Sequence, residues 1–445
     1  MNKLGRGDFI KIAILAALFP PGIVEAKGPT KKVLVVGAGM AGLTAAGSLA
    51  KAGYDVTVLE ARNRIGGRMH TDSSLGMPLD LGAAWVHGAS PSNPLTSIVQ
   101  SLSLKTLVTD ADSMALYYDG SEIEDRTYEA IDEATRKLFQ RGMRLKDEAS
   151  IRATMSQVLQ FRGSGSTVVD LGVRWHFASE IEIELAADAN ELSLKYWDED
   201  EAFAGPEWMV GSGFSAIAQY LARGLKIRAG TVVRQISQNR TGVSLETSAG
   251  SYQADYAIVT LPLGVLKSGT VQFRPGLSAK KQSSIARMKM GTMKKVALLF
   301  SHAFWPPELH RMGLLQKGPF FEFWNMMPLH GRPVLVALTQ GAFARELEGK
   351  SESFVKDRVL SDLRAMFGKV PDPKGFLRTR WYSDPFSRGA YSMIAAGSSL
   401  QDFEILAEPE GRIAFAGEAC NPLYPGTLHG ALLSGQKAAR IIASK

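Results

Sequence analysis

Cysteine and long apolar runs are both scarce in this chain. Cys420 is the one cysteine among 445 residues, which excludes an intrachain disulfide framework and any zinc or iron–sulfur site built on several thiolates. The apolar run at 12–19 contains eight residues. A membrane-spanning helix needs about 20, so we expect no stable membrane span.

Basic residues are dispersed along the chain. The formal net charge is +7, but no run of five basic residues occurs, and we expect no nucleic-acid partner. The apolar fraction of 45% and the charged fraction of 21% are ordinary for a globular enzyme. The length is sufficient for two domains, each with its own core.

The first 26 residues have the order of an export signal. Three basic residues precede the run at 12–19, Pro20-Pro21 interrupts it, and small residues up to Ala26 offer a cleavage site. The stretch 6–11 is similar to a twin-arginine signal that lacks its second arginine. We therefore expect export, to the periplasm or as a secreted protein, with a cytoplasmic location as the alternative.

The stretch 32–68 has the pattern of a βαβ unit. An aliphatic run, Val33–Val36, is followed by a helical pattern and by a second run, Val56–Leu59. Three glycines in fixed spacing separate the first run from the helix: Gly37, Gly39 and Gly42. The first permits a tight turn, the second lets the backbone approach a pyrophosphate, and the third allows close helix packing. The helix then begins at Met40 and Ala41 with unpaired N–H groups facing the phosphates, which predicts a dinucleotide site.

Glu60, at the end of the second run, refines this prediction. A carboxylate there can accept hydrogen bonds from both ribose hydroxyls and would repel a 2′-phosphate, so NADP is disfavoured. The glycines and arginines that follow it, among them Arg62, Arg64 and Arg68, are placed to continue a phosphate site.

Further segments carry a family resemblance. They are Glu60–Arg68 (EARNRIGGR), Asp80–Gly88 (DLGAAWVHG), Leu192–Glu201 (LSLKYWDEDE), Leu261–Gly269 (LPLGVLKSG), Met290–Phe300, Arg380–Ser392 and Arg412–Gly435. Together they resemble the flavin-containing amine oxidase family, and are most similar to its polyamine-oxidase-type members.

The resemblance implies an α/β fold with interleaved domains. A Rossmann-like FAD-binding domain would comprise 27–100, 206–290 and 400–445, and an α+β substrate-binding domain on a mixed sheet would comprise 101–205 and 291–399. FAD would be bound without a covalent link, because Ala390 stands where the monoamine oxidases have the cysteine that bonds to the flavin.

The resemblance also implies the roles of particular residues. Val233 would lie beside the adenine, Trp381 near the flavin ring, and Glu418 near the ribityl chain or pyrophosphate. The helix predicted at 430–442 would point its N-terminus at the flavin pyrimidine. The remaining implied FAD contacts are Ala61, Arg62, Gly67, Arg68, Gly82, Ala83, Ala84, Trp85, Gly417, Thr427 and Leu428.

The implied catalytic residues surround the expected substrate. Lys295 would hold a water at flavin N5: an alternating strand puts only one lysine of the pair on its inner face, and register against the hydrophobic run picks Lys295 rather than Lys294. Tyr391 and Trp85 would be apolar walls and His87 a polar contact to substrate. Thr427 replaces the second tyrosine of the monoamine oxidase cage.

Other segments carry expectations about structure only. Residues 100–190 have helical periodicity and predict an insertion that caps the substrate site. Residues 192–201 are expected to enter the sheet of the substrate domain, with the acids at 198–201 either solvated or forming an acidic mouth. Predicted strands and helices elsewhere are 214–225 (helix), 227–236, 242–247, 251–260, 334–338, 353–367 (helix) and 413–416.

The implied reaction is oxidation of an amine by hydride transfer to FAD, with oxygen as acceptor and hydrogen peroxide as product. Amino acid oxidases of the superfamily place an arginine in the segment that corresponds to 83–87, and this chain has none there. That favours amines without a carboxylate, polyamines first and monoamines second. The alternatives are an L-amino acid oxidase, another FAD-dependent dehydrogenase and a non-catalytic FAD-binding protein.

Overall fold

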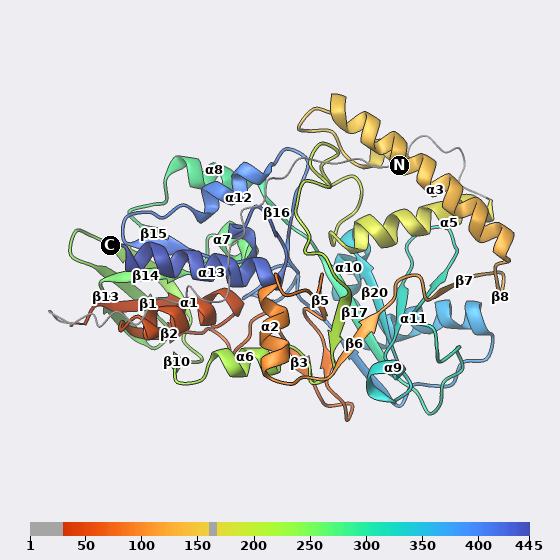
Figure 1. Cartoon of the computed structure of the whole chain (residues 1–445), viewed down its shortest axis with the longest axis horizontal. Helices are drawn as coiled ribbons and strands as arrows, with labels where there is room; N and C mark the ends of the chain where they lie inside the picture. The colour runs from red at the N-terminus through yellow and green to blue at the C-terminus, as the bar shows by residue number, and fades with distance from the viewer. Residues whose placement is uncertain (1–29, 160–166) are drawn as a thin grey trace. The chain divides into compact units, whose positions relative to one another are not determined.

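The computed structural model describes residues 30–159 and 167–445. The expected export signal at 1–26 lies outside these residues. So do residues 163–166, whose Gly-Ser-Gly-Ser order predicts a turn or loop. Residues 31–445 form one compact unit. Figure 1 shows its elements coloured along the chain.

One sheet is entirely parallel and has the order β10-β2-β1-β14-β23. Its strands are Lys226–Arg228, Asp55–Leu59, Lys32–Val36, Tyr256–Val259 and Ile413–Phe415. Helices α1 (Met40–Lys51) and α13 (Leu428–Ala443) pack on each other and on one face, where they meet Val33 and Val35 of β1 (Figure 1). Alternation along the strand sends Leu34 and Val36 to the opposite face.

That opposite face is covered by a second layer of strands and by two helices. The second sheet has the order β13-β12-β11-β15, with strands Gly250–Ala254, Val243–Thr247, Val233–Gln238 and Gln272–Arg274. Helices α8 (Ala279–Arg287) and α12 (Leu400–Ala407) share its core. The family-like segment Leu261–Gly269 contains α7 (Leu263–Ser268). Helices, parallel sheet and second sheet thus form three layers.

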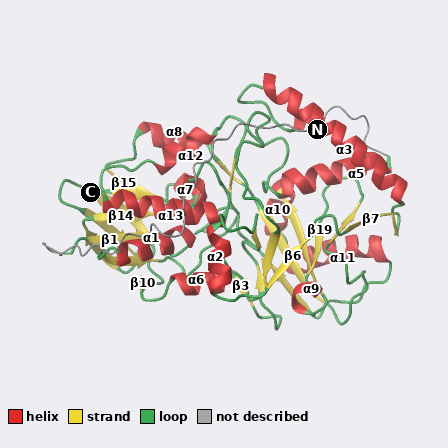
Figure 2. Cartoon of the chain, viewed as in Figure 1, coloured by secondary structure: helices red, strands yellow, loops and turns green. Residues whose placement is uncertain are grey.

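The largest sheet has seven strands in the order β21-β17-β20-β19-β18-β7-β8. Their bounds are Gly375–Arg378, Met293–Leu299, Val334–Gln340, Glu322–Asn325, Arg311–Leu314, Met114–Tyr118 and Ser121–Glu122. Helices α10 (Gly341–Glu348) and α11 (Glu352–Phe367) pack on one face. The other face carries α3 (Asp125–Glu148) and α5 (Val168–Phe177), which continues into a π-helical turn, η1 (Ala178–Ile183) (Figure 2).

Short sheets and helices connect these parts. The sheets are β3 (Thr71–Asp72) with β4 (Leu79–Asp80), β5 (Trp85–Val86) with β9 (Glu207–Val210) and β6 (Thr106–Thr109), and β16 (Lys289–Met290) with β22 (Ser392–Met393). The helices are α2 (Pro94–Ser101), α4 (Ser156–Leu159), α6 (Ser215–Leu221), α9 (Met327–His330) and the 3₁₀ turn η2 (Glu418–Cys420).

The α/β fold class is confirmed, and several element boundaries need correction. The single strand predicted at 227–236 is two strands, β10 and β11, in different sheets. The strand predicted at 251–260 is likewise divided into β13 and β14. Between β13 and β14 the alternation of Tyr252, Ala254 and Tyr256 continues through the corner, whereas Gly230, with φ +67°, marks the corner between β10 and β11. The helix predicted at 214–225 ends at Leu221, and the one predicted at 430–442 begins at Leu428.

Residues 100–190 are not helical throughout. Strands β6, β7 and β8 occupy its first part, and only from Asp125 does the predicted helical periodicity hold. There Ile131 and Leu138 are buried against α5, whereas Met143 of the same helix is exposed. Residues 192–201 form turns and contain no strand of the sheet that they were expected to enter.

In the part of the chain that the structure covers, no helix combines the length and the apolarity that crossing a bilayer requires.

Candidate active site

A cavity of about 830 Å³ collects nearly all residues that the sequence singled out. It begins at the carboxyl ends of β1 and β2, where ligands bind in open α/β sheets, and extends to η1 and β18. The predicted residues that line it are Lys295, His87, Tyr391, Trp85, Thr427, Gly37, Gly39, Met40, Ala41, Glu60, Ala61, Arg62, Gly67, Arg68, Gly82, Ala83, Ala84, Val233, Trp381, Gly417, Glu418 and Leu428. Of the residues predicted to bind the cofactor, Gly42 and Arg64 do not line it.

The three glycines of the βαβ turn differ in what surrounds them. Gly37 has φ +106°, a conformation that L side chains rarely adopt. A Cβ at Gly42 would lie 2.0 Å from the Gly37 carbonyl oxygen, so this glycine serves helix packing. A Cβ at Gly39 would meet no atom within 4 Å. Gly39 therefore presents open backbone to the cavity at the start of α1, as binding of a pyrophosphate requires.

Glu60 is held at the end of β2 by two backbone groups. Its carboxylate accepts hydrogen bonds from the N–H of Ala38 at 2.8 Å and from the N–H of Arg62 at 2.8 Å. The side chain is buried and lines the cavity. Its remaining lone pairs are available to ribose hydroxyls.

The arginines after Glu60 were predicted to be phosphate partners, and the structure corrects this in part. Arg64 does not line the cavity and donates to the carbonyl oxygen of Gly67. Arg62 and Arg68 do line it, but each is paired with an acid: Arg62 with Asp384 at 2.6 Å, and Arg68 with Glu418 at 2.7 Å. They border the cofactor end as partly neutralised cations.

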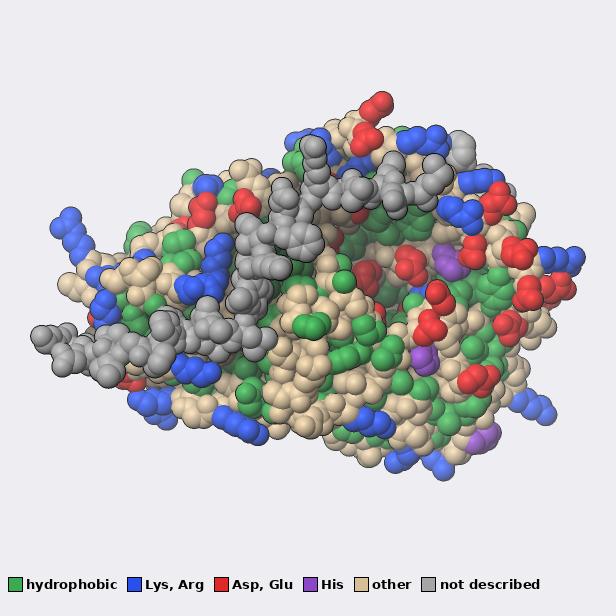
Figure 3. Space-filling model, in the orientation of Figure 1, with side chains coloured by type: hydrophobic (Ala, Val, Ile, Leu, Met, Phe, Trp, Pro, Cys, Tyr) green, Lys and Arg blue, Asp and Glu red, His purple; other side chains and the backbone are tan. Residues whose placement is uncertain are grey.

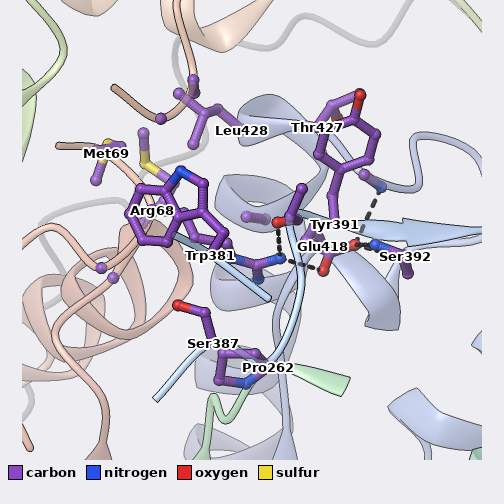
Figure 4. A pocket seen from close by; sticks show the side chains of 18 of the residues that line it. Arg68, Met69, Pro262, Trp381, Ser387, Tyr391, Ser392, Glu418, Thr427 and Leu428 are labelled. Carbon is purple, nitrogen blue, oxygen red and sulfur yellow. Dashed lines mark hydrogen bonds and ion pairs between the residues drawn. The ribbon is translucent and has the colours of Figure 1, made fainter. Parts of the chain in front are cut away.

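Glu418 connects three segments at the cofactor end of the cavity. Besides Arg68, it accepts hydrogen bonds from the hydroxyl and the N–H of Ser392 and from the N–H of Gly426. Figure 4 shows these bonds, with the rings of Trp381 and Tyr391 on either side of the Arg68–Glu418 pair. Because it accepts hydrogen bonds from several protein groups, Glu418 mainly holds together the segments that form this wall of the cavity.

Thr427 caps α13 and directs its N-terminus toward the cavity. Its Oγ1 accepts a hydrogen bond from the N–H of Gly430 at 2.9 Å, and both Thr427 and Leu428 line the cavity. The first N–H groups of this helix favour negative charge nearby.

Lys295 is a buried cation of the cavity wall. Its Nζ donates to the carbonyl oxygens of Gly82 at 2.7 Å and Asp80 at 3.2 Å, and lies 5.4 Å from the centre of the Trp85 ring. Burial lowers the pKa of Lys295 to about 8, although the Asp80 charge opposes this. Burial also raises the pKa of the Asp80 carboxyl to about 6.

Aromatic rings line the cavity at Tyr391 and Trp85, for which the resemblance implied walls, and at Trp381, for which it implied a place near the flavin ring. Trp381 is fixed by its indole N–H, which donates to the Leu81 carbonyl at 2.9 Å. The hydroxyl of Tyr391 donates toward the carbonyls of Ile183 and Glu184, at the end of η1. The sequence offered no sign of this π-helical turn, although such turns are frequent at functional sites and this one contributes Ser179, Glu180 and Ile183 to the cavity wall.

His87 is not an isolated polar group. Its Nδ1 lies 2.6 Å from Oε2 of Glu207, a residue that sequence reasoning missed. His429, also missed, is buried in the same wall, and its Nε2 has no hydrogen-bond partner among the described residues. Burial lowers the pKa of His429 to about 4, so this imidazole stays neutral. The His429 signal was visible as a histidine two residues after Thr427.

Acidic side chains dominate the end of the cavity away from the βαβ turn. Glu180, Glu184, Asp200 and Glu201 are exposed and line the cavity, and Figure 3 shows acidic groups gathered around a hollow. Two of them belong to the run at 198–201, for which an acidic mouth was one of the two expectations.

Arg311 lines this end of the cavity and is neutralised by acids. Arg311 Nη1 lies 3.3 Å from a Glu180 oxygen and 3.6 Å from a buried Glu322 oxygen, and it donates to Ser179. Glu322 also accepts from the indole N–H of Trp324 at 2.5 Å. With these acids in place, Arg311 offers little net charge to a substrate carboxylate.

These residues fit a flavin dinucleotide. The open backbone at Gly39 can hold the pyrophosphate, and the buried Glu60 carboxylate can bind the ribose. The capped N-terminus of α13 can hold an electron-rich edge of the flavin ring, and all three lie in the same cavity. No group of three or more potential metal ligands occurs among the described residues.

Comparisons with known proteins agree with this geometry. The chain is 35% identical to polyamine oxidase 4 of Oryza sativa subsp. japonica over 431 residues, which cover 92% of this chain and 87% of that protein. It is 37% identical to lysine-specific histone demethylase 1 homolog 1 of Arabidopsis thaliana, covering 92% of this chain and 51% of that protein.

A putrescine oxidase double mutant from a redesign of cofactor binding shares the fold with a TM-score of 0.75 at 20% identity, over 94% of this chain and 100% of that chain. The model of the family described as flavin containing amine oxidoreductase matches residues 40–443. The chain therefore belongs to the flavin-containing amine oxidoreductase family, and it is an FAD-dependent enzyme that oxidises amines.

Proposed function

We propose that this enzyme oxidises polyamines, with bound FAD as hydride acceptor and oxygen as the final oxidant. The observation that carries the proposal is the charge of the cavity beyond the aromatic walls. Four exposed carboxylates line it there, together with Glu207, and Arg311 at this end is already paired with Glu180 and Glu322. Similarity to plant polyamine oxidases supports the same substrate class.

A polyamine carries several positive charges along a flexible apolar chain. Acidic groups at the entrance attract such a ligand over a distance of about 10 Å at moderate salt and accept its distal ammonium groups. Trp85, Tyr391 and Trp381 then enclose the methylene chain and exclude water. FAD, when bound, supplies the redox chemistry by taking a hydride from the carbon beside the reacting nitrogen.

An L-amino acid fits this cavity less well. Its carboxylate needs an unpaired cation, and Arg311 is engaged with Glu180, Glu322 and Ser179. Lys295 is engaged with two carbonyl oxygens. An L-amino acid would also meet repulsion from the acidic entrance.

The decisive experiment is anaerobic bleaching of the enzyme-bound flavin absorbance by different amines. The panel contains spermidine, spermine, putrescine, phenylethylamine and several L-amino acids. Polyamines should bleach the flavin fastest and at the lowest concentration, with hydrogen peroxide appearing when air is admitted. Bleaching by amino acids alone would refute the proposal and assign the cavity to carboxylate-bearing substrates.

We also propose that the enzyme is exported, on the basis of the basic, apolar and small-residue order at 1–26. Cell fractionation of the full chain and of a variant that lacks residues 2–26 tests this. The full chain should be found outside the cytoplasm and the shortened one inside. Equal distribution of the two would refute export by this segment.

A further inference from the structure

The pairing of β5 with β9 places a carboxylate opposite the cavity histidine. Trp85 pairs with Met209 and Val86 with Trp208 in antiparallel register, so the next pair along the ladder is His87 and Glu207. Oε1 of Glu207 accepts a hydrogen bond from the Gly88 N–H at 2.9 Å, and Oε2 lies 2.6 Å from His87 Nδ1. Both oxygens of the carboxylate are therefore anchored, one by backbone and one by the imidazole.

This anchoring decides which ring nitrogen carries the proton. A carboxylate accepts only, so Nδ1 of His87 must be the donor, and in the neutral ring Nε2 then holds the lone pair. Among the described residues no hydrogen-bond partner contacts Nε2, and the half-exposed imidazole lines the cavity. The lone pair is thus available to a ligand in the cavity.

The charges around His87 favour proton uptake. Glu207 from β9 and Glu184 beyond η1 face it, and neutral His429 from α13 is the third titratable neighbour. Burial alone would lower the pKa of His87, but the hydrogen bond to Glu207 and the charges of Glu184 and Glu207 outweigh burial and raise it. Lys295 cannot take this role while its Nζ donates to two carbonyl oxygens.

Resting on the proposed amine oxidation, we propose that Glu207 positions His87 so that Nε2 of His87 removes the proton from the reacting ammonium group of the substrate. Hydride can leave the carbon only when the neighbouring nitrogen has a lone pair, whereas polyamines arrive protonated. The N–H bond of the ammonium breaks, its electron pair stays on the substrate nitrogen, and a new N–H bond forms at Nε2. The His87–Glu207 pair changes from a net charge of −1 to zero, and the proton later passes to water at the open entrance.

The first test needs no turnover. In protein labelled with ¹⁵N-histidine, the seven histidines are titrated by NMR, and the His87 signals are assigned by their loss in His87→Gln. The wild-type neutral ring should be protonated at Nδ1. In Glu207→Gln the pKa of His87 should fall, because the amide lacks the charge that raises it. A neutral wild-type ring protonated at Nε2 would overturn the proposal.

The second test is the pH dependence of anaerobic flavin reduction at saturating polyamine. In Glu207→Gln the rate at pH 7 should fall by about tenfold or more, and the acidic limb of the profile should move to lower pH. Glu201→Gln is the matched control, because it removes the same charge from the same cavity without contacting His87. It should raise the polyamine concentration needed for half-maximal reduction and leave the limb in place.

The outcomes separate this inference from the proposed function. If polyamines bleach the flavin of the wild type but the acidic limb of the pH profile does not move in Glu207→Gln, the proton transfer is refuted and polyamine oxidation is not. A wild-type flavin that no amine bleaches would refute both, whatever the NMR titration gives.

Discussion

Lys294 and Lys295 are adjacent in β17, yet their ammonium groups bind carbonyl oxygens on opposite faces of the strand. Nζ of Lys294 donates to Thr379 at 2.8 Å, and Nζ of Lys295 donates to Gly82 at 2.7 Å. Both side chains are buried, and burial lowers the pKa of each to about 8. Of the two, Lys295 lines the cavity and Lys294 does not. Lys294 is therefore a matched control for Lys295: both lysines are buried and equally charged, and they differ in location.

Replacing each lysine by methionine should separate a role in oxygen chemistry from a role in folding. Lys295→Met should slow reoxidation of the reduced flavin by about tenfold or more, because it removes the buried cation whose Nζ lies 5.4 Å from the Trp85 ring. Lys294→Met should leave reoxidation unchanged and affect the melting temperature only. Stopped-flow mixing of reduced enzyme with oxygen measures the rate, and equal slowing in both variants would contradict the assignment.

The pH dependence of reoxidation should follow the charge of Lys295. Its pKa of about 8 means that the ammonium is charged below pH 8 and neutral above it. The second-order rate constant should therefore fall as pH rises through about 8. Asp80→Asn removes the negative charge that holds this pKa up, so the fall should move to lower pH. A profile that is flat from pH 6 to 10 would exclude Lys295 as the responsible group.

The glycines of the βαβ turn should respond differently to a methyl group. In Gly39→Ala the new Cβ meets no protein atom, so the protein should fold but bind FAD about tenfold or more weakly, because the methyl occupies pyrophosphate space. In Gly42→Ala the Cβ would lie 2.0 Å from the Gly37 oxygen, and the folded yield should drop. Circular dichroism and flavin content of the purified variants distinguish the two; full flavin content in Gly39→Ala would contradict the placement of the pyrophosphate.

Arg311 and Glu322 should behave as a coupled buried pair. Arg311→Met leaves the Glu322 carboxyl buried without its cation and should cost about 3–5 kcal/mol of unfolding free energy at pH 8. Burial already raises the pKa of Glu322 and Arg311 opposes that rise, so removing Arg311 raises the pKa further above its unfolded value. The loss should therefore shrink as pH falls and the carboxyl takes a proton.

The double variant Arg311→Met with Glu322→Gln supplies the control for this pair. It should recover a large part of the lost stability, because neither charge remains buried. Urea unfolding of the wild type, Arg311→Met, Glu322→Gln and the double variant measures the free energy of unfolding of each protein and completes the double-mutant cycle. Additive losses in the two single variants would show that the pair is not coupled.

Local pattern determined a good part of this protein. The aliphatic runs at 33–36 and 56–59, the spacing of Gly37, Gly39 and Gly42, and Glu60 after the second run predicted a nucleotide-binding unit, because each requirement is met within about 30 residues of chain. Motif resemblance then indicated Lys295, Trp85 and Tyr391, which the fold brings to one cavity. Strand alternation limited the choice to one lysine of the pair, and register against the hydrophobic run of the family-like strand picked Lys295 over Lys294.

The chemistry between distant segments was decided only by the tertiary structure. Glu207 contacts His87 because strand β9 pairs with strand β5. Gly88, next to His87, and Glu207 are 119 residues apart in the sequence, and no local pattern determines how two such distant strands align. Arg311 looks like a free cation in the sequence and is neutralised by Glu180 and Glu322 from other elements. Propensity and periodicity act over a few residues, whereas the protonation state of a buried group depends on whichever charges the fold brings within a few ångströms of it.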